Sequence, residues 1–208
     1  DYLYRNSDVK VKKPMSIDIV LINKVDRKEQ IPIELKYKTS ELTYFDGAEK
    51  YHLKPQGAQD IGRFSFRKDI FRTEQFIHNK NKENDIDNCK QGFVLILTND
   101  KRYFNESTSK RHSNNILNQN FSFHPGAIVP KEDLSWNYAG IKDDYKFDKK
   151  ENRYKKGTKV HWTCRGAHLL RLNLYNEYVV NWEDFSDLSN LETSVNCLFK
   201  YCLFSIKR

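Results

Sequence analysis

Residues 15–22 have the sequence MSIDIVLI and residues 30–40 the sequence QIPIELKYKTS, and these two stretches decide the fold. The first is a dense apolar run between polar segments, which predicts a buried β-strand. The second alternates, with Ile33 and Leu35 on one side and Glu34 and Lys36 on the other, which predicts a half-buried strand. The connection between them is short and polar, so we expect an antiparallel pair.

The segments that follow predict a mixed α/β protein. Residues 55–80 carry apolar side chains at near-helical spacing after Pro55, which predicts a helix, although Gly62 weakens it unless close packing requires a glycine there. Residues 92–100, GFVLILTND, predict a buried strand after that helix, and the apolar stretch 197–206 predicts a last strand. We expect one domain over residues 1–208, with its core at about 15–99 and 157–208 and a long, loop-rich insertion at about 101–156.

The composition favours a polyanionic partner. The 208 residues include 36 Lys and Arg against 28 Asp and Glu, a formal charge of +8, which suits binding to nucleic-acid phosphates. No run of apolar residues is long enough to span a bilayer and no signal peptide is recognisable, so we expect a cytoplasmic protein that does not bind membranes. Four cysteines without a CxxC pair predict reduced thiols.

Charged residues in the two predicted strands indicate a metal-dependent reaction. Asp18 lies inside SIDIVL, and Glu34 and Lys36 share one face of IELKYK. Strand pairing would bring the two carboxylates together, and with the backbone carbonyl of Leu35 they supply the hard oxygen ligands that Mg²⁺ prefers. Lys36 would orient or help deprotonate water and offset charge on a phosphorane. The reaction predicted is phosphodiester hydrolysis.

Asp18 followed by Glu34-Leu35-Lys36 resembles the D…ExK motif of the PD-(D/E)XK nuclease superfamily, which includes many restriction endonucleases and repair nucleases. The resemblance covers roughly residues 15–99. It implies a restriction endonuclease-like fold, a mixed β-sheet flanked by helices, and an Mg²⁺-dependent DNA endonuclease of restriction or repair type, with Mn²⁺ as a substitute ion. Members usually have a helix and a strand before the acid, whereas only seventeen residues precede Asp18, so we expect that helix to be missing, shortened or relocated, or the chain to be a fragment.

In this superfamily the helix after ExK often contributes to the site. Of the polar residues in QGAQDIGR, Gln59 and Arg63 lie four apart on one helical face, and we take them as the preferred additional catalytic candidates. A homodimer would pair two active sites on the two strands of duplex DNA. The base sequence or DNA structure recognised stays open, as does RNA as the substrate.

Three other interpretations stay open. Asp18, Glu34 and Lys36 could form an ordinary ion-paired patch on a sheet. The chain could be a non-catalytic nucleic-acid-binding protein that retains the nuclease fold. His161, Cys164 and His168 are suitable zinc ligands, but their spacing matches no zinc module.

Overall fold

The structure is a computed structural model of the whole chain. It describes residues 16–27, 29–45, 47–78, 89–106, 122–131, 172–189 and 196–208, with Asp60 in its backbone alone. The backbone of five short strands is described as well: β1 (Leu3–Arg5), β2 (Lys10–Lys12), β9 (Lys146–Asp148), β10 (Arg153–Lys156) and β11 (Lys159–Val160). The predicted zinc ligands His161, Cys164 and His168 lie outside the described residues.

The chain divides into two compact units. One consists of residues 1–16 and 131–173, and the other of residues 17–130 and 174–208. In the first unit, β1 pairs antiparallel with β2, and β10 pairs antiparallel with both β9 and β11. The boundary at residue 130 falls inside the insertion predicted from the sequence, so residues 101–130 belong with the sheet described next.

A five-stranded mixed sheet forms the centre of the second unit, in the order β13-β14-β7-β4-β3. β4 pairs antiparallel with β3 and parallel with β7, while β14 pairs antiparallel with β7 and β13. The strands are β3 (Ile19–Ile22), β4 (Gln30–Lys38), β7 (Gln91–Thr98), β13 (Trp182–Asp187) and β14 (Leu198–Lys207). The predicted antiparallel pair and the predicted mixed α/β class are confirmed.

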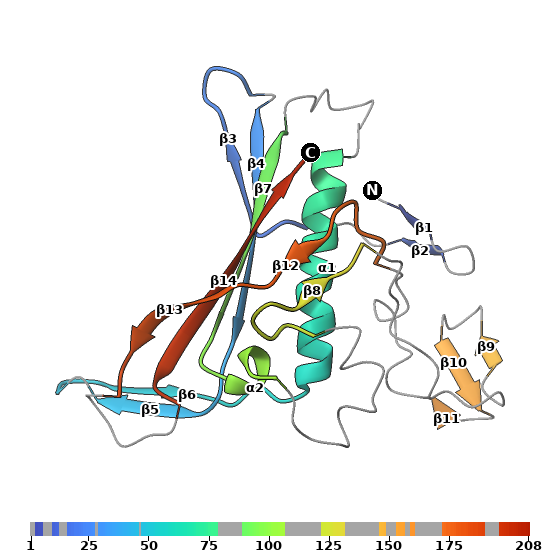
Figure 1. Cartoon of the computed structure of the whole chain (residues 1–208). Helices are drawn as coiled ribbons and strands as arrows, with labels where there is room; N and C mark the ends of the chain where they lie inside the picture. Colours follow the sequence, from blue (N-terminus) through green and yellow to red (C-terminus); the bar gives the residue numbers. More distant parts are fainter. Residues whose placement is uncertain are drawn as a thin grey trace. The chain divides into compact units, whose positions relative to one another are not determined.

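The long helix α1 (Gln59–His78) connects β4 to β7 and runs along one face of this sheet (Figure 1). Its Phe66 and Ile70 are fully buried, as are Val94 and Ile96 on the covered face of β7. A Cβ added at Gly92 would lie 2.7 Å from Thr73 Cγ2 of the helix, so glycine at this position lets the helix approach the strand. Parallel pairing of β4 and β7 requires such a crossover helix.

Shorter elements surround the ends of the sheet. Two further pairs of strands are antiparallel. β5 pairs with β6, the next strand in the chain, and β8 pairs with β12, which is distant in the sequence. A one-turn helix, α2, follows β7 directly. Their bounds are β5 (Leu42–Phe45), β6 (Lys50–Leu53), α2 (Lys101–Phe104), β8 (Ile128–Val129) and β12 (Tyr178–Val179).

The buried carboxylate of Glu74 connects α1 to the segment before β12. It accepts hydrogen bonds from the backbone N–H groups of Tyr175 and Asn176 and from the hydroxyl of Tyr178, at 2.7, 3.0 and 2.7 Å. Burial raises the pKa of Glu74, and the three donors oppose that rise. A carboxylate with three donors is satisfied within the fold, so this contact is structural.

Two details of the sequence prediction need correction. The apolar run at β3 was expected to be buried, but β3 is an edge strand whose Leu21 is 52% exposed. On β4 the alternation is confirmed, yet α1 covers the charged face: Glu34 is 0% exposed and Leu35 is 44% exposed. The physical reason is that α1 presents charged partners to Glu34 and Lys36. On the opposite face of β4, the described residues leave Leu35 exposed.

Close packing accounts for Gly62. A Cβ at this position would lie 2.9 Å from two ring carbons of Tyr103, which is itself buried at 1% exposure. The described part of the chain contains no helix that is both long and apolar enough to cross a membrane.

Candidate active site

Asp18 and Glu34 face each other across the first strand pair. The register joins Ile19 to Ile33, so Asp18, one residue before β3 begins, lies opposite Glu34. The Asp18 carboxylate accepts a hydrogen bond from the backbone N–H of Leu35 at 2.8 Å, which fixes the acid beside β4. The structure therefore brings together the two carboxylates that the sequence predicted as metal ligands, with the backbone of Leu35 next to them.

The Glu34 carboxylate lies between the sheet and α1, where it is completely buried. Its Oε2 accepts a hydrogen bond from Arg72 Nη2 at 2.7 Å, while its Oε1 is buried without a hydrogen-bond partner. Burial raises the pKa of Glu34 to about 8; the Arg72 guanidinium opposes this rise, and the neighbouring Asp69 and Asp18 carboxylates add to it.

Two residues of α1 complete a chain of alternating charges. Arg72 Nη2 also donates to Asp69 Oδ1 at 2.8 Å, and Lys36 Nζ forms an ion pair with Asp69 Oδ2 at 2.9 Å. Asp69 and Glu34 are 0% exposed, whereas the side chains of Arg72 and Lys36 are 17% and 24% exposed. The Glu34 and Asp69 carboxylates thus lie at the bottom of the site, whereas Asp18 is exposed and the two cations are partly exposed.

Buried ion pairs of this kind are costly to break. Removing one partner leaves an uncompensated buried charge, which typically destabilises a protein by about 3–5 kcal/mol. Burial raises the pKa of Asp69, and the Lys36 and Arg72 cations act in the opposite direction. The arrangement holds Lys36 at one fixed position on the covered face of β4, next to the two acids.

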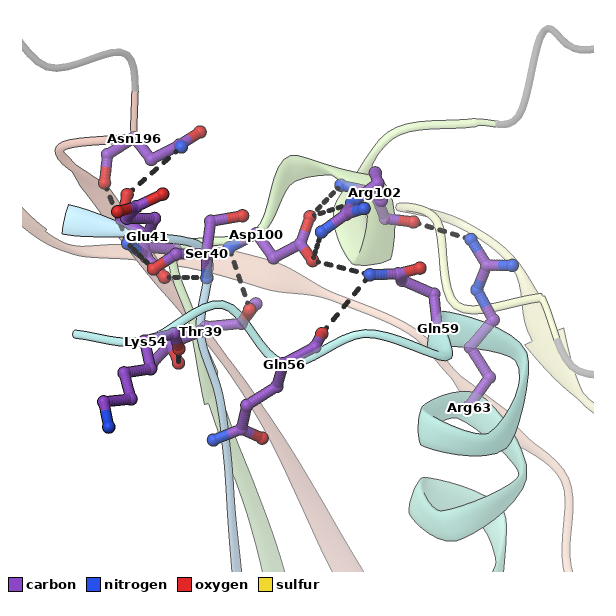
Figure 2. A network of polar contacts seen from close by, with 12 residues as sticks. Thr39, Ser40, Glu41, Lys54, Gln56, Gln59, Arg63, Asp100, Arg102 and Asn196 are labelled. Carbon is purple, nitrogen blue, oxygen red and sulfur yellow. Dashed lines mark hydrogen bonds and ion pairs between the residues drawn. The ribbon is translucent and has the colours of Figure 1, made fainter.

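The other two predicted catalytic residues, Gln59 and Arg63, lie elsewhere. Gln59 Nε2 donates to Asp100 Oδ2 at 3.2 Å, and Arg63 Nη2 donates to the Arg102 backbone carbonyl at 2.6 Å (Figure 2). Ten residues separate Gln59 from Asp69, about 15 Å along a helix at 1.5 Å per residue. These two residues join the start of α1 to α2 and the structure does not bring them to Glu34, so a catalytic role for them stays a prediction.

Asp100 is the centre of that second network. It caps α2 by accepting from the Arg102 backbone N–H at 3.0 Å, and its carboxylate also accepts from the Arg102 side chain at 2.7 and 2.8 Å. Burial would raise the pKa of Asp100, but these donors together with Gln59 lower it below its ordinary value. Each carboxylate oxygen of Asp100 accepts hydrogen bonds, so the network has a structural role and joins α1 to α2 at the end of β7 (Figure 2).

The residues at Glu34 fit a divalent cation. Glu34 Oε1 is buried without a donor, and a carboxylate with such a raised pKa binds a proton or a cation in preference to remaining bare. The described residues contain no group of three or more His, Cys, Asp or Glu side chains that could hold a metal ion. The donor set that remains is the pair Asp18 and Glu34, and Mg²⁺ can bind through one or two carboxylates because it usually keeps several waters.

Asp69 and Arg72 were not singled out from the sequence, although a signal was present. Asp69 lies three residues after Phe66 and four before Thr73, both of which are fully buried. A charged residue on the apolar stripe of a helix requires a partner on the element that it covers. On β4, Lys36 is the partner of Asp69 and Glu34 is the partner of Arg72.

The cysteines give no sign of a metal site in the described part of the chain. Cys89, Cys197 and Cys202 are buried free thiols, as expected for reduced cysteines. Burial raises the pKa of Cys89 to about 11 and that of Cys202 to about 12, so neither is a ready thiolate ligand.

Comparisons with known proteins found no matching family model, no matching curated protein and no matching solved structure.

Proposed function

We propose that the chain is a metal-dependent nuclease of the restriction endonuclease-like type, which hydrolyses phosphodiester bonds in DNA. One observation carries the proposal: Asp18 and Glu34 lie opposite each other across β3 and β4, with Lys36 two residues further on the same covered face. The parallel β4–α1–β7 crossover beside this pair agrees with the layout that the D…ExK resemblance implies.

Each residue has a role that follows from its surroundings. Asp18 and Glu34 would hold Mg²⁺ or Mn²⁺, with the Leu35 carbonyl as a further oxygen ligand. The bound ion would supply Lewis-acid stabilisation of the phosphate and activate water. Lys36, an ammonium held 2.9 Å from Asp69, would offset the negative charge that develops on the phosphate oxygens.

The overall reaction is the addition of water across a phosphorus–oxygen bond. A water oxygen forms a new bond to phosphorus and gives its proton to solvent, while the bond to the leaving sugar oxygen breaks and that oxygen takes a proton from solvent to become a hydroxyl. Arg72 and Asp69 take no part in this exchange of bonds. They act as positioning residues, because Arg72 holds Glu34 and Asp69 holds Lys36.

Cleavage of plasmid and linear duplex DNA with Mg²⁺ or Mn²⁺ tests the proposal. Wild-type protein is expected to cleave only with the ion, and Lys36→Ala is expected to cleave at least a hundredfold more slowly, a typical loss for an electrostatic stabiliser. Equal rates for the two proteins, or equal rates with and without a chelator, would refute it. Lys101→Ala, an exposed lysine on α2, is the matched control.

The ion pairs also favour a second candidate, a non-catalytic nucleic-acid-binding protein. Glu34 is already paired with Arg72, and Lys36 with Asp69, which a purely structural cluster would also show. This candidate predicts salt-sensitive DNA binding and no cleavage with either ion. The adjacency of Asp18 and Glu34 favours the nuclease, because a cluster with only a structural role gains nothing from two neighbouring acids that raise the pKa of Glu34.

A further inference from the structure

Two lysines next to the candidate active site belong to none of its ion pairs. Lys38 lies on the same face of β4 as Glu34 and Lys36, at the two-residue spacing of a strand. Lys68 precedes Asp69 on α1 and lies one helical turn from Arg72, on the same side of the helix. Strand and helix therefore each place one additional cation beside the same cluster.

Both lysines are half-buried, which distinguishes them from ordinary surface lysines. Among the described residues, neither has a carboxylate within ion-pair distance of its ammonium group. Long cationic side chains are almost never buried without a partner, because removing an ammonium from water is costly. Their position requires either a compensating anion or a net cost to the fold.

The two lysines add positive charge to the cluster. Burial lowers the pKa of Lys38 and repulsion from Lys36 lowers it further, whereas the Asp69 carboxylate acts in the opposite direction. Burial also lowers the pKa of Lys68, with Arg72 and Lys36 adding to the effect and Asp69 and Glu34 opposing it. Four cations thus gather around the two buried acids Glu34 and Asp69. The excess positive charge lies on the solvent side of the carboxylates, since Arg72 and Lys36 are the partly exposed members.

We propose that Lys38 and Lys68 bind backbone phosphates of the nucleic acid beside the Asp18–Glu34 site. The inference rests on the proposed function, because it names substrate contacts of that same site. One lysine comes from the sheet and the other from the helix, so together they fix the direction in which the nucleic-acid backbone crosses the site. Such contacts position the substrate and carry no base specificity.

The salt dependence of DNA binding in the presence of a chelator tests this proposal without requiring cleavage. For wild type, Lys38→Gln, Lys68→Gln and the double variant, the affinity for a labelled duplex is measured across a series of NaCl concentrations. The slope of log K against log[salt] is negative, and each lost phosphate contact is expected to reduce its magnitude by about 0.9. The double variant is expected to reduce it by about 1.8. Lys101→Gln, an exposed lysine of α2, is the matched control and is expected to keep the wild-type slope.

Lys38→Arg and Lys68→Arg are expected to retain the wild-type slope, because they keep the charge, and thermal unfolding checks that every variant is folded. A double variant with the wild-type slope, or an equal loss in Lys101→Gln, would overturn the proposal. The two claims fail separately. Metal-dependent cleavage with unchanged slopes would refute the lysine contacts alone, whereas reduced slopes in a protein that never cleaves DNA would support the contacts and refute the nuclease.

Discussion

Glu34→Gln should make the metal-free protein more stable at alkaline pH. The folded protein holds the proton of Glu34 up to about pH 8, against an ordinary pKa of 4.5. Between these values the unfolded chain has released the proton and the folded protein has kept it, so stability falls as pH rises. Glutamine carries no such proton, and its carbonyl can still accept the hydrogen bond from Arg72.

The size of the effect follows from the same two values. Each pH unit between them costs wild type about 1.4 kcal/mol of unfolding free energy, about 5 kcal/mol in all, whereas the variant loses nothing from this position. The gap between the two proteins should therefore widen from pH 4.5 to 8 and stay constant above pH 8. Below pH 4.5 it should also be constant, because both states of wild type then carry the proton.

Urea unfolding of both proteins from pH 4 to 9, with a chelator present, measures this gap. Other titrating groups cancel in the difference, and Glu177→Gln, at an exposed position, is the matched control. A difference that does not change with pH would refute the reasoning about the buried carboxylate. Saturating Mg²⁺ at pH 8 should then stabilise wild type and leave Glu34→Gln nearly unchanged, since the ion replaces the proton on Glu34.

Three further predictions follow from contacts outside or beside the metal ligands. Gly62→Ala should lower the unfolding free energy by about 1–2 kcal/mol, because overpacking against the Tyr103 ring outweighs the gain in helix propensity. Restored stability in the Gly62→Ala, Tyr103→Phe double variant would locate the clash at the Tyr103 hydroxyl, whereas a wild-type melting curve for Gly62→Ala would contradict the prediction. Glu74→Gln should lower the unfolding free energy measured in urea by about 2–3 kcal/mol, because a charged acceptor of three hydrogen bonds is lost. A loss no larger than that of Glu177→Gln would argue against a stabilising role of these hydrogen bonds. Asp69→Asn should lower the cleavage rate more than it weakens DNA binding, because Asp69 holds Lys36 and does not face the substrate. Equal losses in single-turnover rate and binding affinity would contradict this positioning role of Asp69.

Period-two and helical patterns were sufficient for the arrangement of the central elements. The short polar connection between the stretches around Asp18 and Glu34 predicted their antiparallel pairing, and the structure places these acids in register. The patterns could not say which face of β4 is covered, because that depends on α1. The helix contributes Asp69 and Arg72, and with them the charged face became the buried one.

The sequence did not show which residues of α1 lie beside β4. Gln59 and Arg63 were chosen because they follow ExK and share a helical face, but their place along α1 depends on where the helix begins relative to the sheet. The β5–β6 hairpin lies between β4 and α1, and the first turn of α1 consequently meets Asp100 at the end of β7. Asp69, nearly three turns later, is the residue that reaches β4.

The most direct measurement of the central claim is a crystal structure of the protein grown with Mn²⁺, with an anomalous difference map calculated for the ion. We predict a peak within about 2.0–2.3 Å of carboxylate oxygens of both Asp18 and Glu34, and no such peak in Glu34→Gln. A map without a peak at this pair, in a crystal whose Glu34 still holds only Arg72, would contradict it.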